Sequence, residues 1–211
     1  MKIRWLGHAC FLLETEKFKI ITDPFNKEVG YPVINVTADV VTISHDHWDH
    51  NAAQLVGGSP MIIDQEGSFT YQEIQIKGIG SYHDDVQGKK RGTNIMYKIS
   101  TEGMTLLHLG DLGHLLSDQQ VREIGEIDIL FLPVGGNYTI DAREAYKITE
   151  LLKPRIIIPM HFKTPAISFD IDPVEAFTGY FEKVIKKPFL QIDELSPDYS
   201  TQVIVLDYPV N

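Results

Sequence analysis

The sequence predicts an α/β protein in which two β-sheets are faced by helices. Short apolar runs rich in β-branched residues occur in both halves of the chain, and such runs are typical of buried strands. Three amphipathic segments with helix-capping residues lie among them. With 211 residues, 43% of them hydrophobic, and no internal repeat or low-complexity tract, we expect residues 1–211 to form a single domain with a substantial core.

The expected strands follow one another from the N-terminus to the C-terminus. Gly-rich and Pro-rich turns separate them, and a loop at 26–38 with little periodicity interrupts the first group. The expected strands span residues 2–5, 10–14, 19–22, 39–44, 61–64, 73–77, 93–99, 104–108, 127–132, 155–159 and 201–206.

The helices are predicted mainly from their capping residues. Ser117 and Asp141 each precede a Gln or Glu by three residues, which is the pattern of a capping box. Asp172 precedes a Pro at the first helical position, and this third helix is expected to reach Val184. A short helix is also expected at 51–55.

One stretch concentrates the residues typical of a metal site. His45, His47 and His50 are interleaved with two carboxylates directly after the predicted strand at 39–44. In extended backbone every second side chain points the same way, which directs His45, His47 and Asp49 toward one point. Neutral imidazoles and carboxylates bind zinc, and also iron or manganese. Because unpaired burial of these groups is costly, a metal site is favoured over a solvated loop.

The motif His-x-His-x-Asp-His after an apolar strand resembles the signature of the metallo-β-lactamase-fold hydrolase superfamily. The residues that could complete such a site follow in the expected order: His83, Asp111 and His161. The stretches 5–8, 22–25, 110–114 and 133–136 are similar to the subgroup related to L-ascorbate-6-phosphate lactonase and N-acyl-phosphatidylethanolamine phospholipase D. The resemblance covers residues 5–164 and implies a four-layer αββα sandwich.

The resemblance also implies seven ligands for two divalent metal ions, zinc by preference, with iron, manganese or nickel as alternatives. One ion takes His45, His47 and His83. The other takes Asp49, His50 and His161. Asp111 bridges the two ions, and Asp49 is also placed to orient a hydroxide. Two such ions lower the pKa of a shared water and polarise a carbonyl or phosphoryl oxygen.

Three further residues are candidates for contact with the substrate. His114 follows Asp111 by three residues in a Gly-flanked turn and is a candidate to protonate the leaving group. Tyr138 and Lys163 are candidates to bind a developing oxyanion. The alternatives remain open: a capping or surface role for His114, a packed aromatic for Tyr138 and a solvated charge for Lys163.

Other polar residues have two readings each. His8 lies in a turn, either at the surface or beside the metal site, as the resemblance suggests. Asp23 precedes a Pro at a strand end and either ends the strand or, as in the family pattern, orients a ligand histidine. His108 is offset by three strand residues from Asp111, so we expect it in the core or behind the ligands. Cys10 is expected to be a buried thiol.

The formal net charge of −10 argues against non-specific binding of nucleic acid or of anionic membranes. The single compact basic run, Lys89-Lys90-Arg91, is either a solvated turn or a flap that meets a phosphate or carboxylate of the substrate. No apolar run is long enough to span a bilayer, and no signal-peptide pattern or internal disulfide is expected, so a cytoplasmic location is favoured. A small-molecule substrate, including an anionic one, is compatible with this charge, and no pattern indicates an oligomeric state.

These features favour a metal-dependent hydrolase acting on a small ester, lactone or phosphodiester. The resemblance argues against a β-lactamase proper, which lacks the bridging carboxylate that Asp111 would supply. It also argues against diiron flavoproteins, which carry Glu at the position of His47, and against nuclease members with an added nucleic-acid-binding arm. Two alternatives remain: a mononuclear iron-dependent oxygenase using two His and one Asp, and a non-catalytic metal-binding module.

Overall fold

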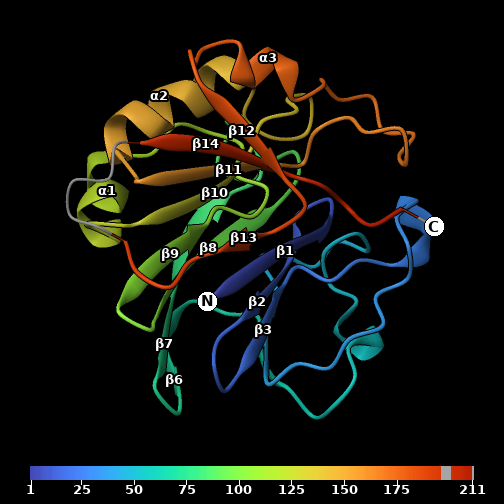
Figure 1. The fold of residues 1–211 in the computed structure, drawn as a ribbon. Coiled ribbons are helices and arrows are strands. Elements are labelled where there is room, and N and C mark those ends of the chain that lie inside the picture. The colour runs from blue at the N-terminus through green and yellow to red at the C-terminus, as the bar shows by residue number, and fades with distance from the viewer. Residues whose placement is uncertain (196–200, 211) are drawn as a thin grey trace.

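The computed structural model describes residues 1–195 and 201–210 and places two β-sheets face to face (Figure 1). Residues 196–200 and 211, part of the expected 1–211 domain, lie outside the described residues. Within the described ranges the first sheet has the strand order β13 (Leu190–Gln191), β1 (Lys2–Gly7), β2 (Cys10–Glu14), β3 (Lys19–Thr22), β4 (Val40–Thr42) and β5 (Met61–Ile63). The second has the order β12 (Val184–Lys187), β14 (Gln202–Leu206), β11 (Ile156–Met160), β10 (Ile129–Pro133), β9 (Met104–His108), β8 (Thr93–Thr101), β7 (Ile74–Tyr82) and β6 (Gly67–Tyr71).

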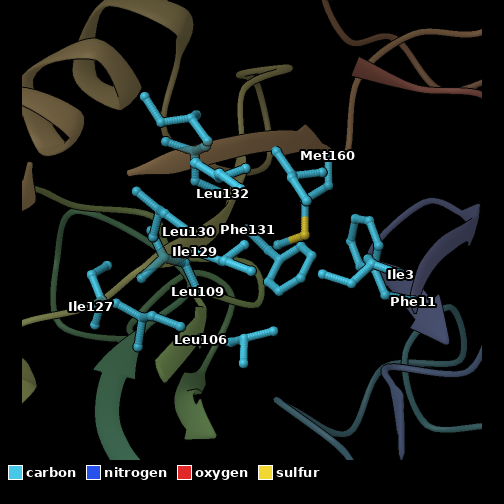
Figure 2. Close-up of a cluster of buried hydrophobic side chains, with 14 of the residues drawn as sticks. Ile3, Phe11, Leu106, Leu109, Ile127, Ile129, Leu130, Phe131, Leu132 and Met160 are labelled. Carbon is cyan, nitrogen blue, oxygen red and sulfur yellow. The ribbon is translucent and has the colours of Figure 1, made fainter. Parts of the chain in front are cut away.

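The alternation of side chains along the strands separates two cores. In β2, Phe11 belongs to the large core between the sheets, whereas the neighbouring Cys10 and Leu12 belong to a smaller core on the other side of the first sheet. Figure 2 shows Phe11 against Phe131 of β10, with ring centroids 4.5 Å apart. Cys10 is a buried free thiol, as predicted.

Helices cover the second sheet on the side away from the first (Figure 1). They are α1 (Asp118–Ile124), α2 (Ala142–Leu152) and α3 (Glu175–Thr178). The capping boxes predicted at Ser117 and Asp141 are both formed. In α2 the small residues Ala142 and Ala145 are buried together with Ile148, which lets the helix lie close to the sheet.

Loops and two 3-10 turns, η1 (Lys27–Val29) and η2 (Ala53–Leu55), accompany the first sheet on its other side. Val29 and Ile167 from these loops pack with Ile21 of the sheet in the smaller core. The α/β sandwich predicted from the sequence is therefore confirmed. The helix expected at 51–55 is the 3-10 turn η2.

The segment after β11 departs from the prediction. The helix expected to open at Asp172 is the single turn α3, which begins after Val174 without a side-chain cap. The backbone of Asp172 instead bonds to Gly135 and Lys163, so it is drawn away from a capping position. Val184, expected on that helix, begins β12 and pairs with β14. The strands β6, β12 and β13 were not predicted.

The parallel strands β3, β4, β9 and β11 deliver their following loops to one region between the sheets. The histidine-rich loop follows β4, Asp111 follows β9 and His161 follows β11. The fold thus brings together polar residues that are far apart in the sequence. Across the described ranges, no helix has the length and apolarity needed to cross a lipid bilayer.

Candidate metal centre

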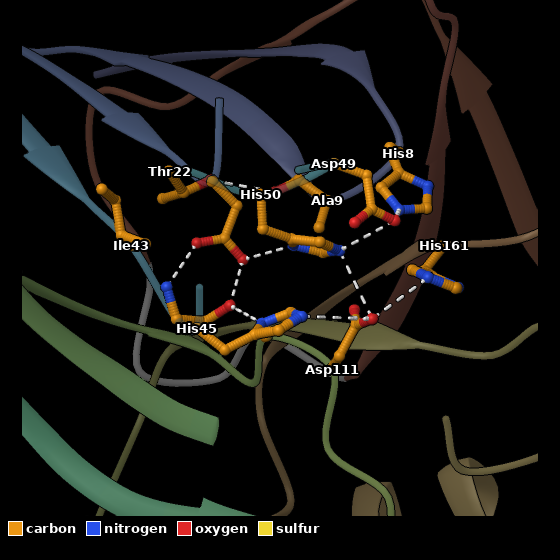
Figure 3. A network of polar contacts seen from close by, with 12 residues as sticks. His8, Ala9, Thr22, Ile43, His45, Asp49, His50, Asp111 and His161 are labelled. Atoms are coloured by element: carbon orange, nitrogen blue, oxygen red, sulfur yellow. Dashed lines mark hydrogen bonds and ion pairs between the residues drawn. The ribbon is translucent and has the colours of Figure 1, made fainter. Parts of the chain in front are cut away.

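Asp111 lies at the centre of a group of buried histidines (Figure 3). Its Oδ2 lies 3.2 Å from Nε2 of His83 and 3.3 Å from Nε2 of both His50 and His161. Nε2 of His45 is 4.0 Å away. Burial opposes the charge on Asp111, but the adjacent histidines outweigh it and hold the pKa of this carboxyl well below its usual range.

The histidine-rich loop contributes one compact group with the residue after β7. The ring centroid of His45 lies 4.4 Å from that of His47 and 4.8 Å from that of His83. One ring nitrogen from each of these three residues lies within 4.8 Å of the others. The structure therefore brings together the three histidines that the resemblance assigns to one metal.

A second group lies beside the first. Ring nitrogens of His8, His50 and His161 also lie within 4.8 Å of one another. Asp49 Oδ2 is 3.8 Å from His50 Nε2 and accepts a hydrogen bond from His8 Nε2 at 3.2 Å. The position of His8 was open in the sequence. The structure buries it completely within the second group, where it holds Asp49.

One buried carboxylate orients two of the histidine rings. Asp23 accepts hydrogen bonds from Ser44 N at 2.8 Å, Ser44 Oγ at 2.6 Å and His50 Nδ1 at 3.0 Å. Because the Ser44 hydroxyl donates to Asp23, it accepts from His45 Nδ1 at 2.9 Å. Both rings thus carry a proton on Nδ1 and direct Nε2 toward Asp111.

These atoms fit a cation. Among the described residues His45 Nε2, His50 Nε2 and Asp111 Oδ1 are buried without a hydrogen-bond partner. Lone pairs and carboxylate oxygens left in this state are costly unless they coordinate a positive ion. Burial lowers the pKa of His45 to about 3 and so keeps its imidazole neutral, the form that binds a metal.

The carboxylates of the centre also favour a positive charge between them. Burial disfavours the charged form of His50, but Asp111 and Asp23 outweigh burial and raise the pKa of His50 well above its usual value. Burial likewise opposes the charge of Asp49, and the hydrogen bond from His8 overcomes it, so the pKa of Asp49 lies below its usual range.

Three residues of the centre have left-handed backbone, which non-glycine residues rarely adopt. The φ values are 53° for His8, 40° for Asp23 and 51° for His161. The carbonyl of His8 accepts hydrogen bonds from Trp5 Nε1 at 2.9 Å and from the His161 amide at 3.2 Å, which holds two of these positions together. Such backbone costs about 1–3 kcal/mol per residue and is concentrated at functional sites.

Two glycines allow the loops of the centre to touch. A Cβ on Gly113 would lie 2.4 Å from the backbone nitrogen of Asp84, next to His83. A Cβ on Gly135 would lie 2.3 Å from the carbonyl oxygen of His161. The two Gly-containing stretches at 110–114 and 133–136 therefore have a packing reason: only glycine lets these backbones approach the histidine loops.

Other candidates lie elsewhere. The structure does not bring His114 to the centre, because its Nε2 accepts from the Tyr82 amide at 3.2 Å and its Nδ1 donates to the Leu115 carbonyl at 2.8 Å. Lys163 donates to the Phe169 carbonyl. His108 is buried and donates to the Ala9 carbonyl at 2.8 Å, in agreement with its predicted core position.

A cleft of about 370 Å³ opens beside the centre. Five residues of the centre line this cleft, namely His47, Asp49, His83, Asp111 and His161. Four other side chains complete its lining, namely Trp48, Arg91, Tyr138 and Phe169. Of His114, Tyr138 and Lys163, Tyr138 is the one that reaches this cleft, and Arg91 of the basic run reaches it as well.

The family model described as the β-lactamase superfamily domain matches residues 2–161. The chain belongs to the β-lactamase superfamily. A relative described as a UPF0173 metal-dependent hydrolase, from Carboxydothermus hydrogenoformans, is 33% identical over an alignment of 203 residues that covers 81% of this chain and 89% of the relative. Another of the same description, from Pyrococcus furiosus, is 31% identical over 88% of this chain and 95% of its own length.

The likeness extends to a solved structure. A Thermotoga maritima protein of the metallo-β-lactamase superfamily is 42% identical, covers 98% of this chain and 99% of its own, and superimposes with a TM-score of 0.83. The superfamily and the fold inferred from the sequence motifs are therefore confirmed. So is the assignment to the metal-dependent hydrolases.

Proposed function

We propose that this β-lactamase-superfamily hydrolase cleaves a small ester, lactone or phosphodiester with the help of two divalent cations, preferably zinc. One observation carries the proposal. Asp111 Oδ2 lies within 4.0 Å of Nε2 of four histidines, and hydrogen bonds at Nδ1 orient two of these rings toward it. A carboxylate in this position suits a bridge between two cations.

We assign the ligands as the family resemblance implies, and the two groups of side chains described above support this assignment. The first cation takes His45, His47 and His83. The second takes Asp49, His50 and His161, and Asp111 lies between them. His8 is assigned to holding Asp49 rather than to a cation, because its Nε2 already bonds that carboxylate at 3.2 Å.

When bound, the two cations supply Lewis acidity and lower the pKa of a coordinated water. The chain's own residues do the rest. Asp49 lines the cleft, and its carboxylate would accept a hydrogen bond that orients the attacking water. Tyr138 also lines the cleft, and its hydroxyl is the donor that we assign to the developing oxyanion. No role falls to His114, whose ring nitrogens are engaged away from the cleft.

The same geometry favours hydrolysis over the mononuclear oxygenase. An oxygenase of that type needs one cation held by two histidines and a carboxylate. The described residues instead supply two sets of three candidate ligands, His45, His47 and His83 in one and Asp49, His50 and His161 in the other, with Asp111 next to both.

Elemental analysis and chelation test the proposal. We expect two metal ions per chain, loss of activity on a panel of lactones and phosphodiesters after metal removal, and recovery when zinc, manganese or iron is returned. His161→Ala should lose the cation of its group, whereas His114→Ala, a matched histidine outside the cleft, should keep both ions and the activity. Full activity in metal-free protein would refute the proposal.

A further inference from the structure

The three basic residues at 89–91 have different surroundings. Lys89 and Lys90 are exposed, and Lys90 pairs with Asp85 at 3.1 Å. Arg91 is half-buried and lines the cleft beside the candidate metal centre. The run is therefore a solvated turn at its first two positions and part of the site at the third.

The backbone of Arg91 is fixed by a single buried carboxylate, Asp84, which directly follows the candidate ligand His83. The two oxygens of Asp84 accept four backbone N–H groups at 2.8–2.9 Å. The donors are Val86, Gly88, Lys90 and Arg91. A carboxylate with this many backbone donors makes a rigid loop, so the distance between His83 and Arg91 is set by the fold.

The guanidinium of Arg91 has donors to spare. Its Nη2 donates to the carbonyl of Asn137 at 3.1 Å, and its Cζ lies 5.5 Å from the centre of the Tyr138 ring. In the chain as far as it is described, no carboxylate pairs with this guanidinium. The remaining N–H groups form a planar fork that matches a carboxylate or a phosphate.

Aromatic side chains form the adjacent wall of the cleft. Phe169 lies between Trp48 and Tyr138, with ring centroids 6.1 Å and 6.4 Å away. Trp48 is 47% exposed and Tyr138 38% exposed. Exposed aromatics gathered at one hollow are typical of a surface that receives an apolar ligand group.

We propose that the cleft selects an amphipathic anion, with an aromatic or aliphatic group against Trp48 and Phe169 and a carboxylate or phosphate on Arg91. This substrate class rests on the proposed hydrolase function for its reaction, whereas binding of the anion does not require turnover.

The test compares two ligands of equal size on the metal-loaded enzyme. Isothermal titration calorimetry measures the affinity of 3-phenylpropanoate, which is anionic, and of 3-phenylpropanamide, which is neutral. We expect Arg91→Gln to weaken the binding affinity for the anion at least tenfold, which is ~1.4 kcal/mol, and to leave the affinity for the amide unchanged. Lys89→Gln removes the same charge from an exposed neighbour and should change neither affinity. A parallel series with 2-phenylethyl phosphate shows which oxyanion is preferred.

A second variant separates binding from folding. Arg91→Lys keeps the positive charge but loses the planar fork of guanidinium N–H groups, so it should retain part of the preference for the anion. Thermal melting of both variants shows whether either is destabilised. Equal anion affinity in wild type and Arg91→Gln, or no binding of either ligand by wild type, would overturn the proposal. Failure of the hydrolase proposal shows itself differently, as activity that survives metal removal.

Discussion

Replacement of Asp23 by Asn tests the arrangement that orients the centre. The substitution keeps the size of a side chain that is fully buried, but it removes the charge and exchanges one accepting oxygen for an NH₂ group. That group cannot accept the hydrogen bonds that Asp23 now receives from Ser44 and His50. His50 then loses the partner that holds its proton on Nδ1.

The magnitude follows from the contacts. Loss of a partner that orients a metal-binding histidine weakens metal binding about 10–100-fold, or ~1.4–2.7 kcal/mol. Burial raises the pKa of Asp23, but the hydrogen bond from His50 and the nearby imidazoles outweigh it, so the pKa lies below its usual value. The charged form therefore stabilises the fold at neutral pH, and we expect Asp23→Asn to lower the free energy of unfolding of metal-free protein by about 2 kcal/mol.

Two measurements check this expectation. Competition with a chromophoric chelator gives the zinc affinity, and urea unfolding of metal-free protein gives the stability. Asp39→Asn is the matched control, because Asp39 accepts the Lys19 amide at 2.8 Å outside the centre and its loss should leave zinc affinity unchanged. Wild-type zinc affinity in Asp23→Asn would show that this carboxylate does not orient the histidines.

Three further changes probe the core, the glycine contact and the anchored loop. Phe131→Ala removes the ring that packs against Phe11 between the sheets and should lower the free energy of unfolding in urea by about 3–5 kcal/mol. Gly135→Ala places a methyl group against the His161 carbonyl, so elemental analysis should find fewer metal ions per chain. Burial opposes the charge of Asp84, but backbone hydrogen bonds outweigh burial and lower the pKa of this carboxyl to about 2. The ionised carboxylate therefore stabilises the fold above about pH 4, and this contribution falls as the pH drops toward 2. The difference in urea midpoint between wild type and Asp84→Asn should accordingly narrow from pH 6 to pH 3.

Each of these changes has a control or an opposing outcome. Leu151→Ala removes a side chain on α2 that is 49% exposed, so it should lower the free energy of unfolding by much less than Phe131→Ala does. Gly103→Ala meets no atom within 4 Å, so it should keep the full metal content even where its left-handed backbone costs stability. A constant difference between wild type and Asp84→Asn from pH 6 to pH 3 would contradict the role given to that carboxylate.

Elements defined by local contacts were predictable from the sequence. The apolar run before the histidine motif is β4, and the two capping boxes form because each involves residues only three apart. The two-residue strand β13 was missed because its partner β1 lies near the other end of the sequence. The strand β12 was missed because Val184 was expected on the helix predicted from Asp172. The helix predicted from Asp172 is one turn long because tertiary hydrogen bonds use the backbone that would have begun it.

The candidate site shows the same division. The interleaved His and Asp residues at 45–50 indicated a metal site from local sequence alone. The backbone at 44–50 forms bends and a turn instead of the expected extended chain, and Asp49 therefore lies beside His8 and His50. The burial of His8 depends on a left-handed turn and on a hydrogen bond to Asp49, 41 residues away, which no local pattern encodes. The position of His114 was open for the opposite reason: a turn gives no direction to its side chain, and here the ring bonds to Tyr82 and Leu115.

Both sheets contribute residues to the candidate metal centre. His8 and His50 follow strands of the first sheet, whereas His83, Asp111 and His161 follow strands of the second. Neither half of the polypeptide carries the whole set, so a fragment or a folding intermediate with only one sheet formed cannot assemble it. A cation bound there acts as a cross-link between the halves and, at a free concentration a thousand times its dissociation constant, adds about 4 kcal/mol against their separation.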